Sequence, residues 1–262
     1  MSPIQQMLLG VPSGGDVSYA CEFNSTNQSL EVAVSNGNFN FNSNGDVTVE
    51  FFVKLDTLTN GSKPYQTFVG RWESGGDEWL LDTDAGKGNV NLYRPGGSGR
   101  FNTSDNVISA NQWHHIAAVK NGTTGTIFVD GVSKVTNGSG WPSGSSNNST
   151  PIDIGNNCSN FGCALDGKIS NFRFTHGALY TSNFTPPSSP LENDAGGGTM
   201  LLMCQDTSPT VALTNQGGTI TNNGSVTTTN SDTPFSEKKK PNRSGVSYCF
   251  DILGVDSILR RS

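Results

Sequence analysis

Three observations predict an all-β fold, a two-sheet antiparallel jelly-roll sandwich. The 262 residues include 32 glycines and 12 prolines and are 33% hydrophobic and 15% charged, a composition typical of turn-rich β proteins. Apolar and polar residues alternate in many short stretches, as expected for strands with one face in a core. These stretches recur at intervals of roughly 8 to 20 residues, with Gly, Asn, Ser and Asp between them, which is typical of sandwiches.

The clearest strand is "DVTVEFFVKLD", which places Val47, Val49 and Phe51 on one face and Glu50 and Phe52 on the other. An aromatic ring on the polar face indicates that both faces are at least partly covered. The other expected strands are "VSYACEF", "LEVAV", "FNF", "QTFVGRW", "EWLLD", "NVNLY", "PIDIG", "KISNFRFT" and "TMLLMCQD". Helix is almost absent, because only "HGALYTSNF" could form a short helical turn before the two prolines that follow it.

The stretch "ANQWHHIAAVKNGTTGTIFVDGVSKV", residues 110–135, predicts two or three strands with a type I′ turn at Asp130-Gly131. Successive side chains of a strand leave on opposite faces, so His114 and His115 cannot bind one metal ion together. We expect one of these histidines to be packed or hydrogen-bonded at a sheet face and the other to be in solvent.

Composition divides the chain into four parts. Residues 1–15 form an apolar docking segment, 16–206 a β-sandwich, 207–235 a Thr/Asn-rich strap or edge hairpin, and 236–262 a basic linker with an apolar C-terminal anchor. The C-terminal apolar residues either dock on another subunit or form a strand on their own sandwich. The candidate assembly residues are Ile4, Met7, Leu8, Leu9, Phe250, Ile252, Leu253, Ile258 and Leu259.

Charge and hydropathy exclude several classes of partner. A net charge of -6 and a pI near 5.0 argue against a nucleic-acid-binding surface, which needs a basic excess. The sequence has no run of about 18 apolar residues, so no membrane span is predicted. The opening residues have no positively charged region and too short an apolar core for a secretory signal, so export by that route is not indicated.

Five cysteines without any C-x-x-C motif give no zinc pattern. Cys158 and Cys163 bracket a short loop and could close a ring in an oxidising medium, whereas free thiols are expected in cytosol. Cys21 and Cys204 become neighbours if their strands pair. The sequence leaves both possible disulfides open.

No catalytic site is predicted. Retaining glycoside hydrolysis needs two carboxyl groups about 5 Å apart, on one face of a strand. Asp82 and Asp84 share a face, and the other carboxylates in this region are Glu73, Asp77 and Glu78. No G-x-S-x-G nucleophile motif accompanies the three histidines.

Binding is better supported, because sugar faces stack on aromatic rings while polar side chains contact their hydroxyls. Trp72, Trp79 and Trp113 lie in strand patterns and are expected in the core. Trp141 lies in the loop "NGSGWPSGSSNNSTP" without an evident core role, and it is the first candidate contact. Tyr93 and Arg94 are the other candidate ligand-binding residues.

The order of motifs resembles the laminin G-like domains of the concanavalin A-like lectin/glucanase superfamily. The resemblance covers about residues 16 to 205 and depends on "YACEFNSTNQSLEVAV", "NFNFNSNGDVTVEFFVKLDTL", "TFVGRWESGGDEWLLDTDAGKGNVNLYR", the 110–135 stretch and "ALDGKISNFRFTHGALYTSNFTPPSSPLE". It implies a jelly roll whose members bind glycans or proteins, some with calcium. Its glucanases carry Glu-x-Asp-x-x-Glu, which this sequence lacks.

The family's calcium pattern is degraded here. Where its members commonly have Phe-Asp-Gly and Ile-Asp-Asp, this chain has Phe23-Asn24-Ser25 and Ile169-Ser170-Asn171. Because calcium prefers several charged oxygens, the resemblance implies no cofactor and at most a weak calcium site at Asn24 and Asn171. These amides could instead hydrogen-bond the loops that the ion would hold.

The ending "YTSNFTPPSSPL", the strand "LLMCQD" and the start "MSPIQQMLLG" are similar to laminin G-like structural proteins of marine bacteriophages. The resemblance implies a non-enzymatic virion protein of a fibre, appendage or capsid decoration, displaying a lectin-like sandwich for adhesion to glycans or a host surface. Its partners would be other virion proteins bound through the termini, with a trimer the favoured homo-oligomer. The alternative is a free-standing secreted or surface carbohydrate-binding module.

Overall fold

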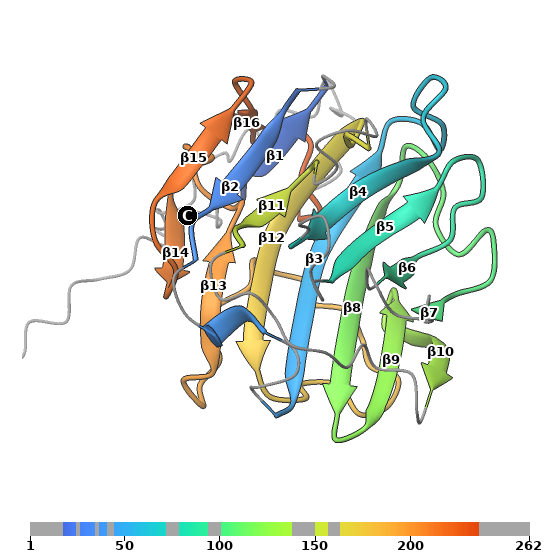
Figure 1. Cartoon of the computed structure of the whole chain (residues 1–262), viewed down its shortest axis with the longest axis vertical. Helices are drawn as coiled ribbons and strands as arrows, with labels where there is room; N and C mark the ends of the chain where they lie inside the picture. Colours follow the sequence, from blue (N-terminus) through green and yellow to red (C-terminus); the bar gives the residue numbers. More distant parts are fainter. Residues whose placement is uncertain are drawn as a thin grey trace, which may run out of the picture.

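The computed structural model describes residues 18–24, 27–34, 37–40, 45–71, 79–93, 101–137, 150–156 and 163–235. Two antiparallel sheets stack face to face, which confirms the predicted jelly-roll sandwich (Figure 1). The predicted docking segment, basic linker and C-terminal anchor lie outside the described residues. So do the candidate assembly residues Ile4, Met7, Leu8, Leu9, Phe250, Ile252, Leu253, Ile258 and Leu259.

The larger sheet, sheet A, has nine strands among the described residues. Its main path is β10 (Val132–Asn137), β9 (Thr124–Val129), β8 (Trp113–Asn121), β3 (Val47–Leu55), β12 (Gly167–His176), β1 (Ala20–Phe23) and β16 (Thr227–Thr229). Off this path, β13 (Thr199–Met203) pairs with β12, and β14 (Ala212–Asn215) pairs with β13.

The smaller sheet, sheet B, has seven strands in the described part of the chain. Their order is β15 (Ile220–Asn223), β2 (Ser29–Val32), β11 (Ile152–Ile154), β4 (Tyr65–Gly70), β5 (Leu80–Asp84), β6 (Asn91–Tyr93) and β7 (Phe101–Asn102). A single turn of 3-10 helix, η1 (Gly37–Phe39), follows β2. Within the described ranges no helix is long and apolar enough to cross a bilayer.

The core lies between the sheets, and β3 shows how the sequence builds it. Val47, Val49 and Phe51 are fully buried in the central cluster, as their alternation predicts. Glu50 and Phe52 on the opposite face are buried as well. The outer face of sheet A is therefore covered, in agreement with the interpretation of Phe52 as a sign of two covered faces.

Residues 177–191, which we name the covering segment, cross the outer face of sheet A. The sequence allowed a helical turn in 176–184, but these residues form no helix and have bends at 177, 181 and 182. The polar groups of the covering segment bond to the sheet rather than to each other. The Leu179 amide donates to Thr48 Oγ1 at 3.0 Å, and the Ser133 amide of β10 donates to Asn183 Oδ1 at 2.8 Å.

The turn between β9 and β10 also holds the covering segment. Asp130 and Gly131 have φ values of 51° and 74°, which confirms the predicted type I′ turn. The Phe184 amide donates to the Gly131 carbonyl at 2.9 Å. A Cβ on Gly131 would lie 1.9 Å from the Phe184 carbonyl oxygen, so only glycine permits this approach.

Residues 207–235 complete the sheet edges at one side of the sandwich. The sequence did not decide whether this part forms a strap over the sandwich or an edge hairpin. In the structure β14 pairs with β13, β15 with β2 and β16 with β1, so three separate edges are extended. Asp232 then accepts hydrogen bonds from Lys54 Nζ at 2.8 Å and Trp113 Nε1 at 3.0 Å, and Phe235 packs edge-on against Phe52.

The three cysteines among the described residues, Cys21, Cys163 and Cys204, are buried, and Cys21 and Cys204 are free thiols. Cys21 lies in β1 and Cys204 directly follows β13, and these two strands lie along the same edge of β12 without pairing to each other. Cys21 pairs with Ile169, and the Asn171 amide donates to the Cys204 carbonyl at 3.0 Å. Contact with the Cys21 thiol, together with burial, raises the pKa of Cys204 well above its usual value. These two thiols therefore act as core side chains.

The exchange of Gly131 for alanine tests how the turn holds the covering segment. Gly131→Ala combines a left-handed backbone with a steric overlap, so it should lower the free energy of unfolding by about 3 kcal/mol. Gly122→Ala is the matched control, since Gly122 also has a positive φ, 59°, but no atom lies within 4 Å of its Cβ position. It should cost only about 1 kcal/mol. Urea denaturation of both variants measures the difference, and equal losses would show that the overlap is unimportant.

Candidate functional site

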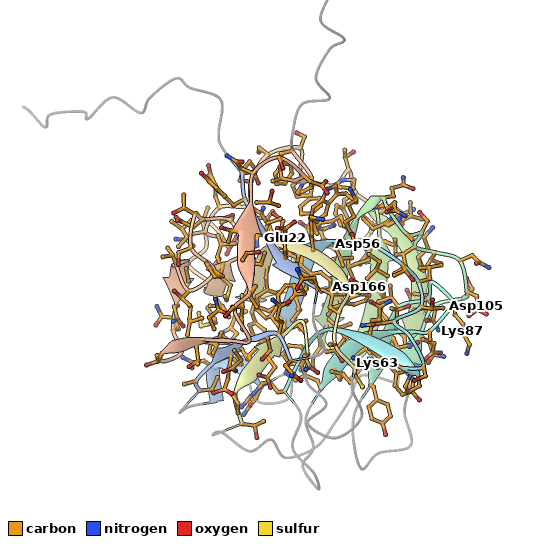
Figure 2. All side chains as sticks on the ribbon, turned by 90° about the horizontal axis from the view of Figure 1, so that it is seen from above. Glu22, Asp56, Lys63, Lys87, Asp105 and Asp166 are labelled. Carbon is orange, nitrogen blue, oxygen red and sulfur yellow. The ribbon has the colours of Figure 1, made fainter. Side chains whose placement is uncertain are left out.

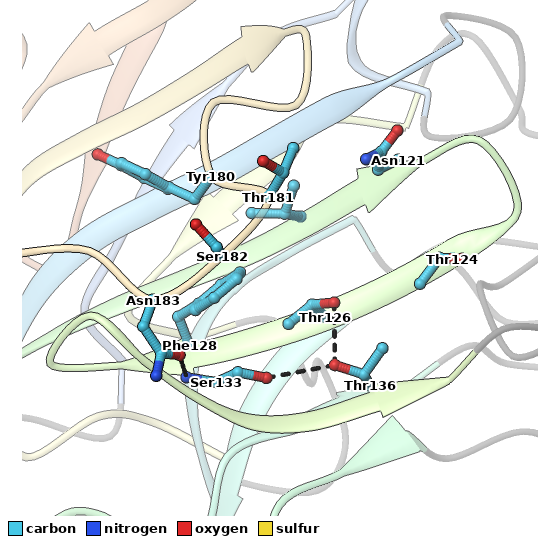
Figure 3. A pocket seen from close by; sticks show the side chains of 11 residues that line it. Asn121, Thr124, Thr126, Phe128, Ser133, Thr136, Tyr180, Thr181, Ser182 and Asn183 are labelled. Carbon is cyan, nitrogen blue, oxygen red and sulfur yellow. Dashed lines mark hydrogen bonds between the residues drawn. The ribbon is translucent and has the colours of Figure 1, made fainter.

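A groove lies on the outer face of sheet A, beside its β10 edge, with a volume of about 170 Å³ (Figure 3). One wall is the covering segment, and the floor and other wall are strands β8, β9 and β10. The described residues that line it are Val119, Asn121, Thr124, Thr126, Phe128, Ser133, Thr136, Tyr180, Thr181, Ser182 and Asn183.

The groove combines an apolar floor with a hydroxyl rim. Val119 and Phe128 are buried beneath it, with exposed fractions of 1% and 2%. At the rim Thr136 Oγ1 lies 3.2 Å from Thr126 Oγ1 and 3.2 Å from Ser133 Oγ. The three hydroxyl groups therefore form a chain in which each member can donate or accept.

The hydroxyl rim depends on an irregularity in β10. Thr126 pairs with Thr136, as a regular ladder requires. Ser133 and Thr136 are three residues apart and would point to opposite faces of a regular strand. The register shifts between Ser133 and Val135, so both hydroxyl groups reach the groove.

Tyr180 forms the wall contributed by the covering segment. Its ring stacks on Phe184 at a centroid separation of 3.6 Å and an interplanar angle of 6°. Its hydroxyl donates to Glu50 Oε2 at 2.8 Å. Burial and the Glu50 charge raise the pKa of Tyr180, so the hydroxyl remains a protonated donor. The ring is thus fixed from both sides.

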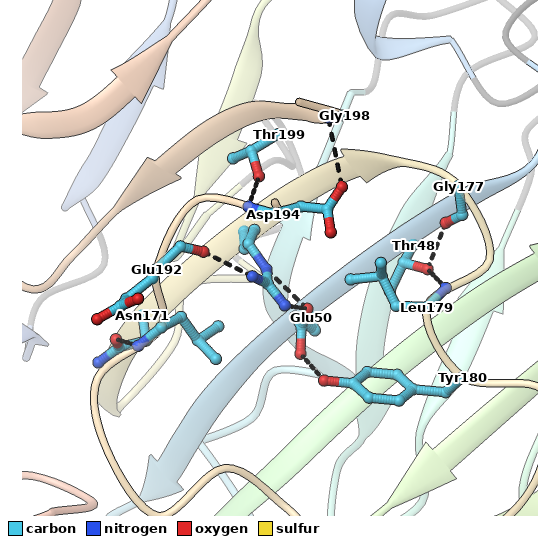
Figure 4. A network of polar contacts seen from close by, with 12 residues as sticks. Thr48, Glu50, Asn171, Gly177, Leu179, Tyr180, Glu192, Asp194, Gly198 and Thr199 are labelled. Atoms are coloured by element: carbon cyan, nitrogen blue, oxygen red, sulfur yellow. Dashed lines mark hydrogen bonds and ion pairs between the residues drawn. The ribbon is translucent and has the colours of Figure 1, made fainter. Parts of the chain in front are cut away.

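Glu50 is the centre of a buried charge network behind Tyr180, on the same face of sheet A as the groove (Figure 4). Its carboxylate has no exposed surface, and its Oε1 accepts hydrogen bonds from Arg173 Nε at 2.8 Å and Nη2 at 2.6 Å. Its Oε2 lies 3.1 Å from His115 Nε2 and also accepts the Tyr180 hydroxyl. Arg173 Nη1 donates to the Glu192 carbonyl at 2.6 Å, just beyond the covering segment.

The pKa of Glu50 shows which effect dominates in this network. Burial by itself would raise it, but the hydrogen bond with His115 and the charge of Arg173 outweigh burial, so the pKa is lowered. A carboxyl group whose pKa falls on folding stabilises the protein above its unfolded pKa. That contribution is lost as the pH drops through the folded value.

Glu50→Gln should remove this stabilisation. Loss of one partner from a buried ion pair leaves Arg173 uncompensated, so we expect the free energy of unfolding at pH 7 to fall by about 3 to 5 kcal/mol. The difference in the free energy of unfolding between wild type and variant should become smaller as the pH drops below 4.5, the ordinary pKa of Glu. The matched control is Glu22→Gln, because Glu22 is partly exposed and lies 3.5 Å from Lys168, a pair worth about 1 kcal/mol or less. Denaturation at several pH values measures both, and a pH-independent gap would contradict the assignment.

The two adjacent histidines serve separate roles, as their strand position predicted, but neither is in solvent. His114 and His115 are 7% and 1% exposed, so the expectation of one solvated histidine is wrong. His114 Nδ1 lies 2.7 Å from Asp130 Oδ2, and the Ser109 amide donates to its Nε2 at 3.0 Å. The hairpin turn buries the first ring and the covering segment buries the second.

The structure does not bring Asn24 and Asn171 together. Phe23 pairs with Gly167, so Asn171 lies opposite position 19, and Asn24 lies beyond the other end of β1. Five strand positions correspond to about 17 Å, too far for a shared ion. Asn171 instead accepts the Leu191 amide at 2.7 Å, so it holds a loop as the sequence allowed.

Acidic residues do gather at one end of the sandwich, where Figure 2 shows Glu22, Asp56 and Asp166. Lys168 lies among them, with its Nζ 3.5 Å from Glu22, 3.7 Å from Asp56 and 3.4 Å from Asp232. Burial and the charge of Asp56 raise the pKa of Asp166. In the described part of the chain no group of three or more acidic, histidine or cysteine residues could hold a metal ion.

Asp82 and Asp84 share a face of β5, as their spacing predicted, and both are buried. Asn91 Nδ2 donates to Asp82 Oδ1 at 2.8 Å and to Asp84 Oδ1 at 3.2 Å. Asp84 Oδ2 also accepts from Lys87 Nζ at 3.0 Å and Asn89 Nδ2 at 3.1 Å. The pair therefore joins β5 to β6, and it lies in sheet B, away from the groove.

Of the predicted ligand residues, Trp141 and Arg94 lie outside the described residues. Tyr93 is half-buried at the end of β6 in sheet B, so it is not part of the groove. Trp79 is 3% exposed and belongs to the core, as expected. The groove was not predicted from the sequence, although Thr124 and Thr126, which line it, lie on one face of their strand.

Fold and groove together define a two-layer β-sandwich with a polar groove on its outer face. A family model described as the concanavalin A-like lectin/glucanases superfamily (Laminin_G_3) matches residues 16–183. The chain belongs to this family, which confirms the resemblance seen in the sequence. No curated protein sequence matches it.

Solved structures show the same fold. A putative carbohydrate binding protein from Bacteroides ovatus is similar with a TM-score of 0.59 and 15% identity, over 82% of this chain and 60% of that protein. The NanB sialidase of Streptococcus pneumoniae, as its K499G mutant, gives a TM-score of 0.50 and 13% identity, over 70% and 31% of the two chains. This chain thus spans less than two thirds of either relative, and the likeness establishes the fold.

Proposed function

We propose that this protein is a non-catalytic glycan-binding module whose binding site is the groove on sheet A. The observation that carries the proposal is the groove's combination of an apolar floor, Val119 and Phe128, with the hydroxyl chain Thr126-Thr136-Ser133. A sugar ring presents C–H groups on its faces and hydroxyls at its edge, so it matches both surfaces. Membership in a lectin-containing family and the likeness to a putative carbohydrate binding protein support this function.

The charges of the described residues support binding rather than hydrolysis. Glycoside hydrolysis uses two carboxyl groups that flank the scissile bond. The described groove residues include no Asp or Glu, and the carboxylate of Glu50, behind Tyr180, is occupied by hydrogen bonds with Arg173, His115 and Tyr180. Asp82 and Asp84 are engaged by Asn91 in the other sheet.

Blocking the groove tests the site without changing the core. Thr136 is exposed on an edge strand, so Thr136→Trp should leave the fold intact and fill the groove with an indole ring. The wild type should bind glycans on an array, and the variant should lose at least about tenfold in affinity by calorimetry. Thr221→Trp, at an exposed threonine of β15 in the other sheet, is the matched control and should bind as wild type does. Unchanged binding by Thr136→Trp would place the glycan elsewhere.

We further propose that the module is displayed on a bacteriophage virion, as a homo-oligomer attached through its terminal segments. The support is the similarity of "MSPIQQMLLG", "YTSNFTPPSSPL" and "LLMCQD" to phage structural proteins. Apolar residues at 4–9 and 250–259, with a basic linker before the latter, support attachment through the terminal segments. Attachment would leave the groove available to host-surface glycans. A free-standing carbohydrate-binding module is the alternative.

Truncated forms of the chain distinguish display on a virion from a free-standing module. Removal of residues 1–12 or 244–262 should abolish incorporation into particles, while the remaining sandwich keeps its melting temperature and its glycan binding. Size-exclusion chromatography with light scattering should show a loss of oligomers, with a trimer expected for the full chain. Normal incorporation of both truncated forms, or absence of the full chain from particles, would favour the free-standing module.

A further inference from the structure

We infer that the groove selects a single uncharged sugar residue and holds it without a metal ion. This inference rests on the proposed glycan-binding function and narrows it to a ligand class. Three features of the groove support it: the charges of its lining residues, the chemistry of its hydroxyl chain, and its volume.

The lining residues exclude an anionic ligand. Carboxylates and sulfates are normally held by Arg, Lys or His side chains, which provide charge-assisted hydrogen bonds. None of the eleven described residues that line the groove belongs to these types. Arg173, in the network that Tyr180 contacts, is engaged elsewhere, because its guanidinium donates to Glu50 at 2.6 and 2.8 Å. The net charge of -6 would also repel an acidic glycan as it approaches.

The hydroxyl chain favours hydroxyl groups on the ligand. Thr126, Ser133 and Thr136 each offer one donor and two acceptor positions, and either partner can donate in the two 3.2 Å contacts. Sugar hydroxyls have the same dual character, so they can insert into this chain and leave no group without a partner. An anion only accepts and an ammonium group only donates, so neither uses the donors and the acceptors of the chain together as a sugar hydroxyl does.

The volume of the groove indicates a single sugar residue, and the lack of carboxylate oxygens among its described lining residues indicates binding without a metal ion. Its volume of about 170 Å³ is well below the roughly 300 to 1,000 Å³ of sites that enclose drug-sized ligands. The groove therefore accommodates one ring of a glycan, with the remainder in solvent. Calcium prefers several carboxylate oxygens, and the described lining residues provide none. Contact between the groove and the sugar then needs no calcium ion.

Binding of defined sugars to the full chain tests the inference. The neutral probes are the methyl glycosides of glucose, galactose, mannose and N-acetylglucosamine, and the anionic probes are sialyllactose and heparin-derived oligosaccharides. We expect at least one neutral glycoside to bind with the same affinity in calcium and in EDTA, and the anionic probes to show no binding at this groove. Saturation-transfer NMR detects weak contacts, and calorimetry gives the affinities.

Isosteric variants connect that binding to the hydroxyl chain. Thr126→Val and Thr136→Val keep shape and strand preference but remove one hydroxyl each, so each should weaken neutral-sugar binding by about tenfold or less. Thr221→Val on the opposite sheet is the control and should leave affinity unchanged. Thermal melts of all three variants confirm that the fold is retained, so a loss of affinity reports on the groove.

The outcomes separate this inference from the proposed function. Binding of anionic probes alone, loss of neutral binding in EDTA, or neutral binding that both valine variants leave unchanged would overturn the inference while glycan binding stands. If neither neutral nor anionic probes bind, the proposed function fails together with the inference. Neutral, EDTA-resistant binding that both valine variants weaken supports it.

Discussion

The outer face of sheet A depends on one buried carboxylate. A buried charge without contact to solvent must be fully paired. Glu50 meets this requirement, because Arg173, His115 and Tyr180 all contact its carboxylate. Because Arg173 comes from β12, His115 from β8 and Tyr180 from the covering segment, this single group joins four parts of the chain. The other face of the same strand, β3, lies at the centre of the core. Core and groove therefore share one scaffold.

This arrangement explains how a groove can form on a sheet surface. Strands present rows of side chains but no depth, so a wall has to come from elsewhere. The covering segment supplies that wall, and it is held at Gly131 by a backbone contact, at Ser133 by Asn183 and at Glu50 by Tyr180. Attachment at several points orders the wall before any ligand arrives, which reduces the entropy cost of binding.

The sequence predicted the fold better than the site. The alternation in β3, the Asp130-Gly131 turn and the core position of Trp79 follow from local periodicity and local backbone preference. The site depends on features with no local signal. The shift in β10 that aligns Ser133 with Thr136 is a pairing irregularity, and it reverses the face that simple alternation assigns.

By itself, the sequence determined that this chain forms a two-layer β-sandwich, because burial of alternate residues is a property of each strand alone. It also determined that the two adjacent histidines act separately. Only the tertiary structure decided which polar residues contact each other. Glu50 and Arg173 are 123 positions apart, and no local pattern in the sequence indicates that they pair. A binding surface is made by such long-range contacts, and these are set by the packing of the whole chain.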